Sequence, residues 1–152
     1  MEQALEREIL RAGRNGRTVG VIMLDLDHFK RFNDTYGHEA GDMLLRALGA
    51  FLVSHVRAED IACRFGGEEF VVILPEAPLA MCRTRAEELW KGVQGLCVNF
   101  HGELLRGITT SIGVAAFPAH GKTTAELLRA ADTAMYGAKR QGRDRVEIAE
   151  QK

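Results

Sequence analysis

Apolar residues recur along the chain at two spacings, which predict helices and strands in alternation. Segments with helical spacing are expected to form helices over residues 1–12, 28–37, 39–55 and 79–93, and from the Thr123–Glu126 capping box to about 141. Runs rich in β-branched and other apolar residues predict strands over 18–26, 61–74 (a hairpin), 96–100, 108–117 and 145–148. This alternation favours an α/β (α+β) sandwich in which helices cover a sheet.

The hairpin contains the most informative stretch, Arg64-Phe65-Gly66-Gly67-Glu68-Glu69-Phe70. Two glycines between two β runs predict a two-residue turn at Gly66-Gly67, because such turns need a positive φ that glycine adopts at little cost. The glutamates Glu68 and Glu69 follow directly. Two adjacent acids at the end of a hairpin suggest a bound cation, and glycines beside them let phosphates approach the backbone.

Composition narrows the class of protein. The chain has 152 residues, 46% of them hydrophobic and 27% charged, which fits one globular domain. A net charge of −1 gives no electrostatic reason to expect nucleic acid as a partner, and no apolar run is long enough for a membrane segment. Three cysteines without CxxC spacing indicate reduced thiols and a cytoplasmic location.

Carboxylates are predicted at two strand ends. Asp25 and Asp27 close one predicted strand, and Glu68 and Glu69 open another. If these strands are neighbours, three or four carboxylates face one point, and their repulsion favours a bound cation. All-oxygen ligation points to Mg²⁺ or Mn²⁺, which usually accompanies substrate phosphates.

Cations for such phosphates are close in sequence: Lys30 follows the first acids, and Lys139 and Arg143 are spaced i, i+4 on the last predicted helix. Each feature has a simpler interpretation. An isolated Asp-x-Asp is often two solvated acids, the hairpin acids could be solvent charges, and Lys139 with Arg143 could complement the helix dipole. Their convergence favours a metal-dependent nucleotidyl or phosphoryl transfer site.

Several motifs, in order, also resemble those of the GGDEF domain, the diguanylate cyclase family. Gly66-Gly67-Glu68-Glu69-Phe70 resembles its signature. Further resemblances lie in Asp25-Leu26-Asp27-His28-Phe29-Lys30, Asn33-Asp34, Gly37-His38, Gly41-Asp42, Ser111–Ala115 and Ala131–Arg143. The resemblance covers nearly the whole chain and implies a mostly antiparallel central sheet flanked by helices, related to the nucleotidyl cyclase palm. It also implies that residues 1–152 form one catalytic domain.

The resemblance implies roles for individual residues. The metal ligands would be Asp25, the Leu26 carbonyl, Glu68 and, less directly, Glu69, with two Mg²⁺ (or Mn²⁺) ions per active site. Glu68 would also be the base for the attacking 3′-hydroxyl. The substrate-binding residues would be Asn33 and Asp42 for guanine, and His28, Phe29, Lys30, Gly66, Gly67, Lys139 and Arg143 for the phosphates.

The implied reaction condenses two GTP molecules into cyclic di-GMP with loss of two pyrophosphates. Because each subunit binds one GTP, catalysis would require a homodimer with facing active sites. A carboxylate at Asp42 suits guanine, which offers two N–H donors there where adenine does not. The alternative is a non-catalytic module that binds GTP or cyclic di-GMP and passes a signal to a partner.

Arg57-Ala58-Glu59-Asp60 resembles the family's RxxD product-inhibition site, in which Arg57 and Asp60 would bind guanine. A solvated turn is the simpler interpretation of this short pattern. A second arginine from the following helix would be needed, and the sequence leaves Arg83 and Arg85 open.

Two departures from the family pattern stand out. The segment that usually precedes the first helix is missing, and so is any sensor domain, so the chain is expected to be a fragment of a longer sensor protein. Dimerisation is the property that this places most in doubt. Asp144 stands where the family commonly has Asn, with little effect expected.

Overall fold

The computed structural model describes residues 1–151. Its helices are α1 (Glu2–Asn15), α2 (Phe29–Tyr36), α3 (His38–His55), α4 (Leu79–Gln94) and α5 (Thr124–Arg140). Its strands are β1 (Val19–Leu26), β2 (Ile61–Gly66), β3 (Glu69–Pro75), β4 (Val98–Phe100), β5 (Glu103–Leu105), β6 (Thr110–Phe117) and β7 (Arg145–Ile148).

The main sheet has the strand order β2-β3-β1-β6-β7, with β1 at its centre. Every pairing in it is antiparallel except that of β6 with β7. The mostly antiparallel sheet flanked by helices is therefore confirmed. A second, two-stranded sheet pairs β4 with β5. The strand predicted over 96–100 corresponds to β4, whereas β5, which is only three residues long, was not predicted.

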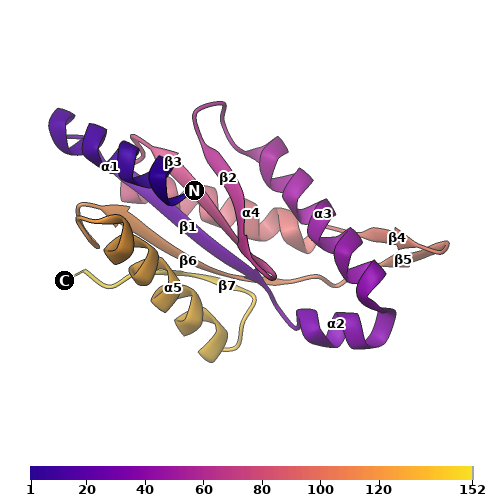
Figure 1. Ribbon diagram of the computed structural model, residues 1–152. Helices are drawn as coiled ribbons and strands as arrows, with labels where there is room; N and C mark the ends of the chain where they lie inside the picture. The colour runs from indigo at the N-terminus through magenta and orange to yellow at the C-terminus, as the bar shows by residue number, and fades with distance from the viewer. Residues whose placement is uncertain (152) are drawn as a thin grey trace.

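Helices cover both faces of the sheet (Figure 1): α1 and α5 lie on one face, and α3 and α4 lie on the other. The side chains of β1 alternate between them. Ile22 and Leu24 join the core under α3 and α4, whereas Val21 and Met23 join the core under α1 and α5. All eight residues of β1 are buried, as the continuous apolar run predicted.

Helix α5 lies very close to the sheet where it crosses Gly113 of β6. A Cβ built on Gly113 would stand 2.0 Å from the carbonyl oxygen of Ala131 and 2.4 Å from the amide nitrogen of Met135. Only glycine permits this approach. At its start, α5 has the predicted capping box between Thr123 and Glu126. The close approach brings the last turn of α5 down to the end of β1.

The end of α1 differs from the expected one at Ala12. The helix continues through Gly13 to Asn15, and Gly16, with φ 63°, ends it. The left-handed conformation that stops the helix is therefore at the second glycine of the Gly13–Gly16 stretch, because a helix can pass through one glycine at modest cost.

All three cysteines are free thiols, and Cys82 is buried. Within residues 1–151, no helix has the length and apolar character needed to span a membrane.

Candidate active site

Asp25 ends the row of β1 side chains that faces α5. It follows Val21 and Met23 on that face and is only 3% exposed. Its Cα partners in the neighbouring strands are Glu69 of β3 and Ser111 of β6. The convergence of Asp25 with the hairpin acids, predicted from sequence, therefore follows directly from the strand register.

One oxygen of Asp25 has a partner and the other has none. Oδ2 forms an ion pair with Nζ of Lys139, which comes from the last turn of α5. Oδ1 is buried and has no hydrogen-bond partner among the described residues. An orphaned carboxylate oxygen inside a protein is costly, because burial removes its water without replacing it. A bound cation is one partner that this oxygen could accept.

The electrostatics of the acids agree with this placement. Burial raises the pKa of Asp25 from 3.8 to about 6, the ion pair with Lys139 opposes this rise, and the charges of Glu68 and Glu69 add to it. The pKa of Glu69 is also raised, first by burial and then by the charge of Asp132 on α5. A divalent cation beside these acids would favour their charged forms and so oppose both shifts.

The turn of the signature hairpin is one residue later than predicted. Strand β2 runs through Gly66, β3 begins at Glu69, and the turn is Gly67-Glu68, with the positive φ of 42° at Gly67 alone. The physical reason is an irregularity in the pairing between Arg64 and Gly66, which advances β2 by one residue. Glu68 therefore lies in the turn itself, not at the start of a strand.

The backbone of this turn is open to a ligand. A Cβ placed on Gly66 or Gly67 would meet no atom within 4 Å. The Nε–H of Arg64 donates to the Gly67 carbonyl at 2.8 Å and helps to fix the turn. Sequence reasoning missed Arg64, although it lies within the signature stretch.

Asp27 does not join the carboxylate cluster. Its Oδ1 accepts from Ser111 Oγ at 2.6 Å, and its Oδ2 accepts from Thr109 Oγ1 at 2.7 Å and from the Asp144 amide at 3.0 Å. With these donors the carboxylate is already satisfied within the protein. Of the three or four carboxylates that the sequence left open, Asp27 is the one engaged elsewhere, because Ser111, Thr109 and the Asp144 amide supply its hydrogen bonds.

The first turn of α2 presents free amides just after the end of β1. His28 precedes the helix with φ 57°, and the first helical bond runs from the Phe32 amide to the His28 carbonyl at 3.0 Å. The amides of Phe29 and Lys30 lie before that bond and have no partner among the described residues. Together with the exposed Lys30 side chain, they form a surface suited to phosphate oxygens.

Asn33 and Asp42, the two residues expected to bind guanine, both lie near the start of α3 but do not line the same cavity. Asn33 rests on the start of α3, where a Cβ on Gly41 would lie 1.8 Å from its Oδ1, and this oxygen is buried without a partner. Asp42, the next residue along α3, lines a cavity of about 420 Å³. The other residues of that cavity are Leu45, Arg46, Arg64 and Phe70.

Arg143 lies in a different place from the one predicted. Helix α5 ends at Arg140, so Arg143 is in the following loop, with φ 63°, and not on the helix with Lys139. The helix stops because Gly142, with φ 115°, turns the chain away. Lys139 is also engaged differently than expected: it is paired with Asp25 rather than free for phosphates.

The described residues contain no preformed cluster of three or more His, Cys, Asp or Glu side chains that could hold a metal ion. The donor set nevertheless fits Mg²⁺ or Mn²⁺, because it offers the orphaned Asp25 oxygen and two nearby glutamates, all hard oxygen ligands. Mg²⁺ commonly takes one or two carboxylates and completes its shell with water and substrate phosphates.

A second polar cluster lies at the start of β2. The Arg57 amide donates to Asp60 Oδ2 at 2.8 Å, and Arg85 Nη2 of α4 lies 3.4 Å from the same oxygen and 2.9 Å from the His55 carbonyl. Arg83 instead pairs with Glu87 at 3.1 Å. Of the two arginines that the sequence left open, the structure brings Arg85 to Arg57 and Asp60.

The sequence missed three other residues in or near the site: Asp132, Trp90 and Gln94. Asp132 affects Glu69 through its charge, and Trp90 and Gln94 hold the side chain of Asp144. Trp90 and Gln94 lie on α4, far in sequence from the motifs, whereas Asp132 lies within the Ala131–Arg143 motif but was given no role. Helical spacing gave no sign of these contacts.

The comparisons with known proteins agree with this architecture. Residues 1–145 match the family model described as "Diguanylate cyclase, GGDEF domain". The response regulator PleD of Caulobacter vibrioides is 42% identical over 147 residues, which cover 96% of this chain and 32% of PleD. The chain therefore belongs to the GGDEF domain family, and it spans about a third of the length of that relative.

Solved structures show the same fold. The GGDEF domain of YfiN (TpbB) from Pseudomonas aeruginosa has a TM-score of 0.94 and 35% identity, covering 99% of this chain and 94% of that one. The GGDEF domain of DgcB from Caulobacter crescentus, solved in complex with c-di-GMP, has a TM-score of 0.92 and 35% identity, covering 99% and 86%.

Proposed function

We propose that this chain is the catalytic domain of a diguanylate cyclase, which condenses two GTP molecules into cyclic di-GMP and two pyrophosphates in the cytoplasm. The observation that carries the proposal is Asp25, a buried carboxylate with one orphaned oxygen. It lies opposite Glu69, near the end of β1, and the free amides of α2 follow that strand in the chain. Family membership and relatives that are named diguanylate cyclases support it.

Asp25, the Leu26 carbonyl, Glu68 and Glu69 would hold two Mg²⁺ or Mn²⁺ ions. When bound, these ions would polarise the α-phosphate and lower the pKa of the attacking hydroxyl. The raised pKa of Asp25 and Glu69 supports the assignment, since both groups gain from a nearby cation.

The remaining residues would bind GTP. Asn33 has a buried, unpartnered oxygen and Asp42 lines a cavity, so both can accept from the N–H donors of guanine. The phosphate-binding groups would be the amides of His28 and Phe29, the amide and side chain of Lys30, the open backbone of Gly66 and Gly67, and the side chains of Lys139 and Arg143.

Each reaction step forms one phosphodiester bond. The 3′-hydroxyl of one GTP attacks the α-phosphorus of the other, the bond to the β-phosphate oxygen breaks, and pyrophosphate leaves. Glu68, in the turn beside the site, takes the hydroxyl proton. A second, equivalent step closes the ring, so two copies of the chain must face each other as a homodimer. Product would also bind at Arg57, Asp60 and Arg85 and inhibit the enzyme.

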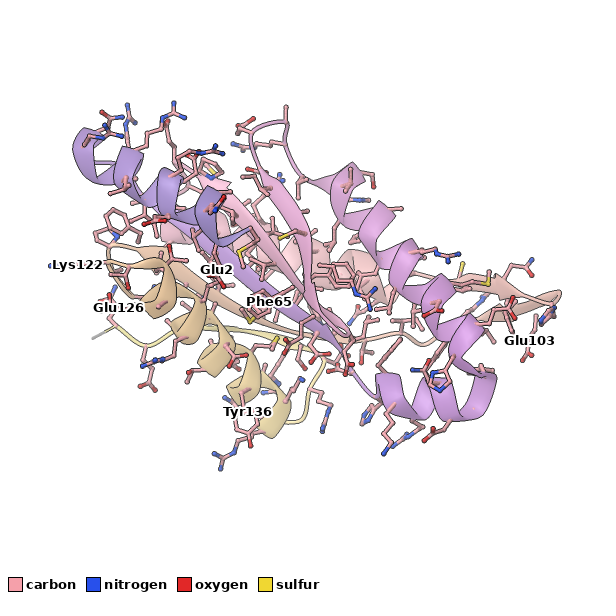
Figure 2. The ribbon with its side chains drawn as sticks, viewed as in Figure 1. Glu2, Phe65, Glu103, Lys122, Glu126 and Tyr136 are labelled. Carbon is pink, nitrogen blue, oxygen red and sulfur yellow. The ribbon has the colours of Figure 1, made fainter. Side chains whose placement is uncertain are left out.

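The proposal is tested by incubating concentrated protein with GTP and Mg²⁺ and separating the products by ion-exchange chromatography. Wild type is expected to make cyclic di-GMP, and Glu68→Gln to lose roughly 10²–10⁴-fold in turnover through loss of the base. Glu103→Gln is the matched control, because Glu103 lies at the right-hand end of the molecule in Figure 2, away from the hairpin residue Phe65 near its middle.

A second candidate is a non-catalytic receptor for cyclic di-GMP. The assembled cluster of Arg57, Asp60 and Arg85 favours it, since that cluster needs no metal. Fusion to a dimeric coiled coil separates the two candidates. Product from the fused dimer supports the cyclase, whereas cyclic di-GMP binding without any product from that dimer supports the receptor.

A further inference from the structure

The loop after α5 is held in an unusual backbone conformation. Arg143 and Asp144 both have positive φ values, 63° and 47°, and they directly follow Gly142 at 115°. Residues with a Cβ rarely adopt this region, and two in succession persist only where the surroundings fix them. The loop carries Arg143, whose guanidinium has no hydrogen bond or ion pair among the described residues.

Asp144 supplies most of the contacts that fix this loop. Its Oδ1 accepts from Trp90 Nε1 at 2.7 Å and from Gln94 Nε2 at 3.1 Å, both on α4. Its backbone amide donates to Asp27 Oδ2 at 3.0 Å. One residue therefore ties the loop to α4 on one side and to the end of β1 on the other.

The second anchor of the loop is the Arg143 amide, which donates to the Ala138 carbonyl at 3.0 Å. This bond fixes the backbone of Arg143 against the last turn of α5, which also carries Lys139. The Arg143 side chain is thus the free element of a loop whose backbone is held at both ends. The direction of this side chain depends on the two anchors, because Arg143 and Asp144 would not keep their positive φ values without them.

We propose that Asp144 is a positioning residue: it clamps the loop to Trp90, Gln94 and Asp27 so that Arg143 is directed at the outer phosphates of the nucleotide. The proposal rests on the proposed function, because it assigns Arg143 to GTP. What the clamp needs is an acceptor oxygen at residue 144, which both Asp and Asn possess and Ala lacks.

The first test compares the affinities for GTP and GMP, which differ in the outer phosphates. Asp144→Ala is expected to weaken GTP binding about tenfold, which corresponds to ~1.4 kcal/mol, and to leave GMP binding unchanged. Asp144→Asn keeps the acceptor and should restore GTP affinity. Arg140→Ala, which removes a neighbouring cation of α5, is the matched control and should change neither affinity.

A double-mutant cycle then separates positioning from simple stabilisation. If Asp144 acts through Arg143, adding Asp144→Ala to Arg143→Ala causes no further loss of GTP affinity. Additive losses, or equal losses for GTP and GMP, would overturn the proposal. Should Asp144→Ala fail to fold, Trp90→Phe removes one donor of the clamp, keeps an aromatic ring, and should weaken GTP but not GMP binding in the same cycle.

Trp90 is the only tryptophan in the chain, so its fluorescence reports on the clamp. Pyrophosphate is expected to shift the emission of wild type and Asp144→Asn but not that of Asp144→Ala; the same shift in all three would contradict the proposal. These measurements need no turnover. A chain that shows the cycle but makes no cyclic di-GMP when dimerised overturns the catalytic function alone, whereas a chain that binds no GTP overturns both.

Discussion

Asp25 and Asp27 stand two residues apart at the end of the same strand, yet their surroundings are opposite. Asp27 accepts hydrogen bonds from Ser111, Thr109 and the Asp144 amide. Asp25 has one ion pair, one orphaned oxygen and a raised pKa. Both oxygens of Asp27 accept hydrogen bonds within the protein, whereas one oxygen of Asp25 has no partner in the described part of the chain and could bind a ligand.

The difference teaches that the motif Asp-x-Asp contains two kinds of residue. Antiparallel register puts Asp25 beside Glu69, whereas Asp27 meets the hydroxyls of β6 and the segment just before it. A satisfied acid holds the framework together, and an unsatisfied one binds the ligand at a cost in stability. The two aspartates should therefore respond to substitution in different assays.

The largest effect is expected on turnover. Asp25→Asn keeps the shape of the side chain but removes the charge that would bind the proposed cation, so we expect turnover to fall about 10³-fold, or ~4 kcal/mol. Product formation from GTP measures this, with circular dichroism to confirm folding. Asp34→Asn, on the exposed face of α2, is the control and should keep normal turnover. Equal activity of Asp25→Asn and wild type would contradict the assignment.

Substitution of Asp27 is expected to lower the free energy of unfolding more than substitution of Asp25. Asp27→Ala leaves three donors without their acceptor, so we expect the free energy of unfolding to fall by about 3 kcal/mol. Urea unfolding at pH 7 measures the loss. Asp25→Ala, which removes a partly unsatisfied acid, should cost clearly less, and a larger loss for Asp25→Ala than for Asp27→Ala would reverse the comparison.

The pH dependence of stability should isolate Asp25. Because its pKa rises from 3.8 to about 6 on folding, the folded protein binds the extra proton between these values, and its stability falls as pH rises through this window. Relative to Asp25→Asn, wild type should lose on the order of 2 kcal/mol between pH 4 and 7. Urea titrations at each pH measure the difference, and a difference that does not vary with pH would refute the prediction.

The smallest effect concerns one hydrogen bond. Ser111→Ala removes the donor to Asp27 Oδ1, so the free energy of unfolding should fall by about 1 kcal/mol. GTP affinity should not change, although Ser111 is also the strand partner of Asp25. Ser54→Ala, an exposed serine at the end of α3, is the stability control. A loss of GTP affinity in Ser111→Ala would show that the two aspartates are not independent.

Most of the fold could be predicted from the sequence, because burial determines the pattern of apolar residues along the chain. The continuous apolar run of β1 and the helical spacing in α3 and α4 mark their elements directly. The ends of the elements were predicted less well, because each depends on which of two nearby glycines adopts positive φ. This holds for the turn at Gly67-Glu68 and for the end of α1 at Gly16. Local sequence does not decide between them.

The site was predicted in part for a similar reason. Asp25, Glu68 and Glu69 could be placed together because strand ends and turns are readable from the chain. The hydrogen bonds of Asp27 could not be predicted, because their donors come from residues more than 80 positions away. The choice of Arg85 over Arg83 likewise depends on which side of α4 faces Asp60.

The ion pair between Lys139 and Asp25 gives the Asp25 carboxylate a counter-ion that belongs to the protein itself. This counter-ion, the Lys139 ammonium, is attached to α5. Under the proposed function, a divalent cation bound through Oδ1 would share the carboxylate with this ammonium, so the free ion alone would gain less than at an unpaired acid. An incoming triphosphate would change the balance, because it would give the ammonium a new partner. Binding of the metal and binding of the nucleotide would therefore be coupled.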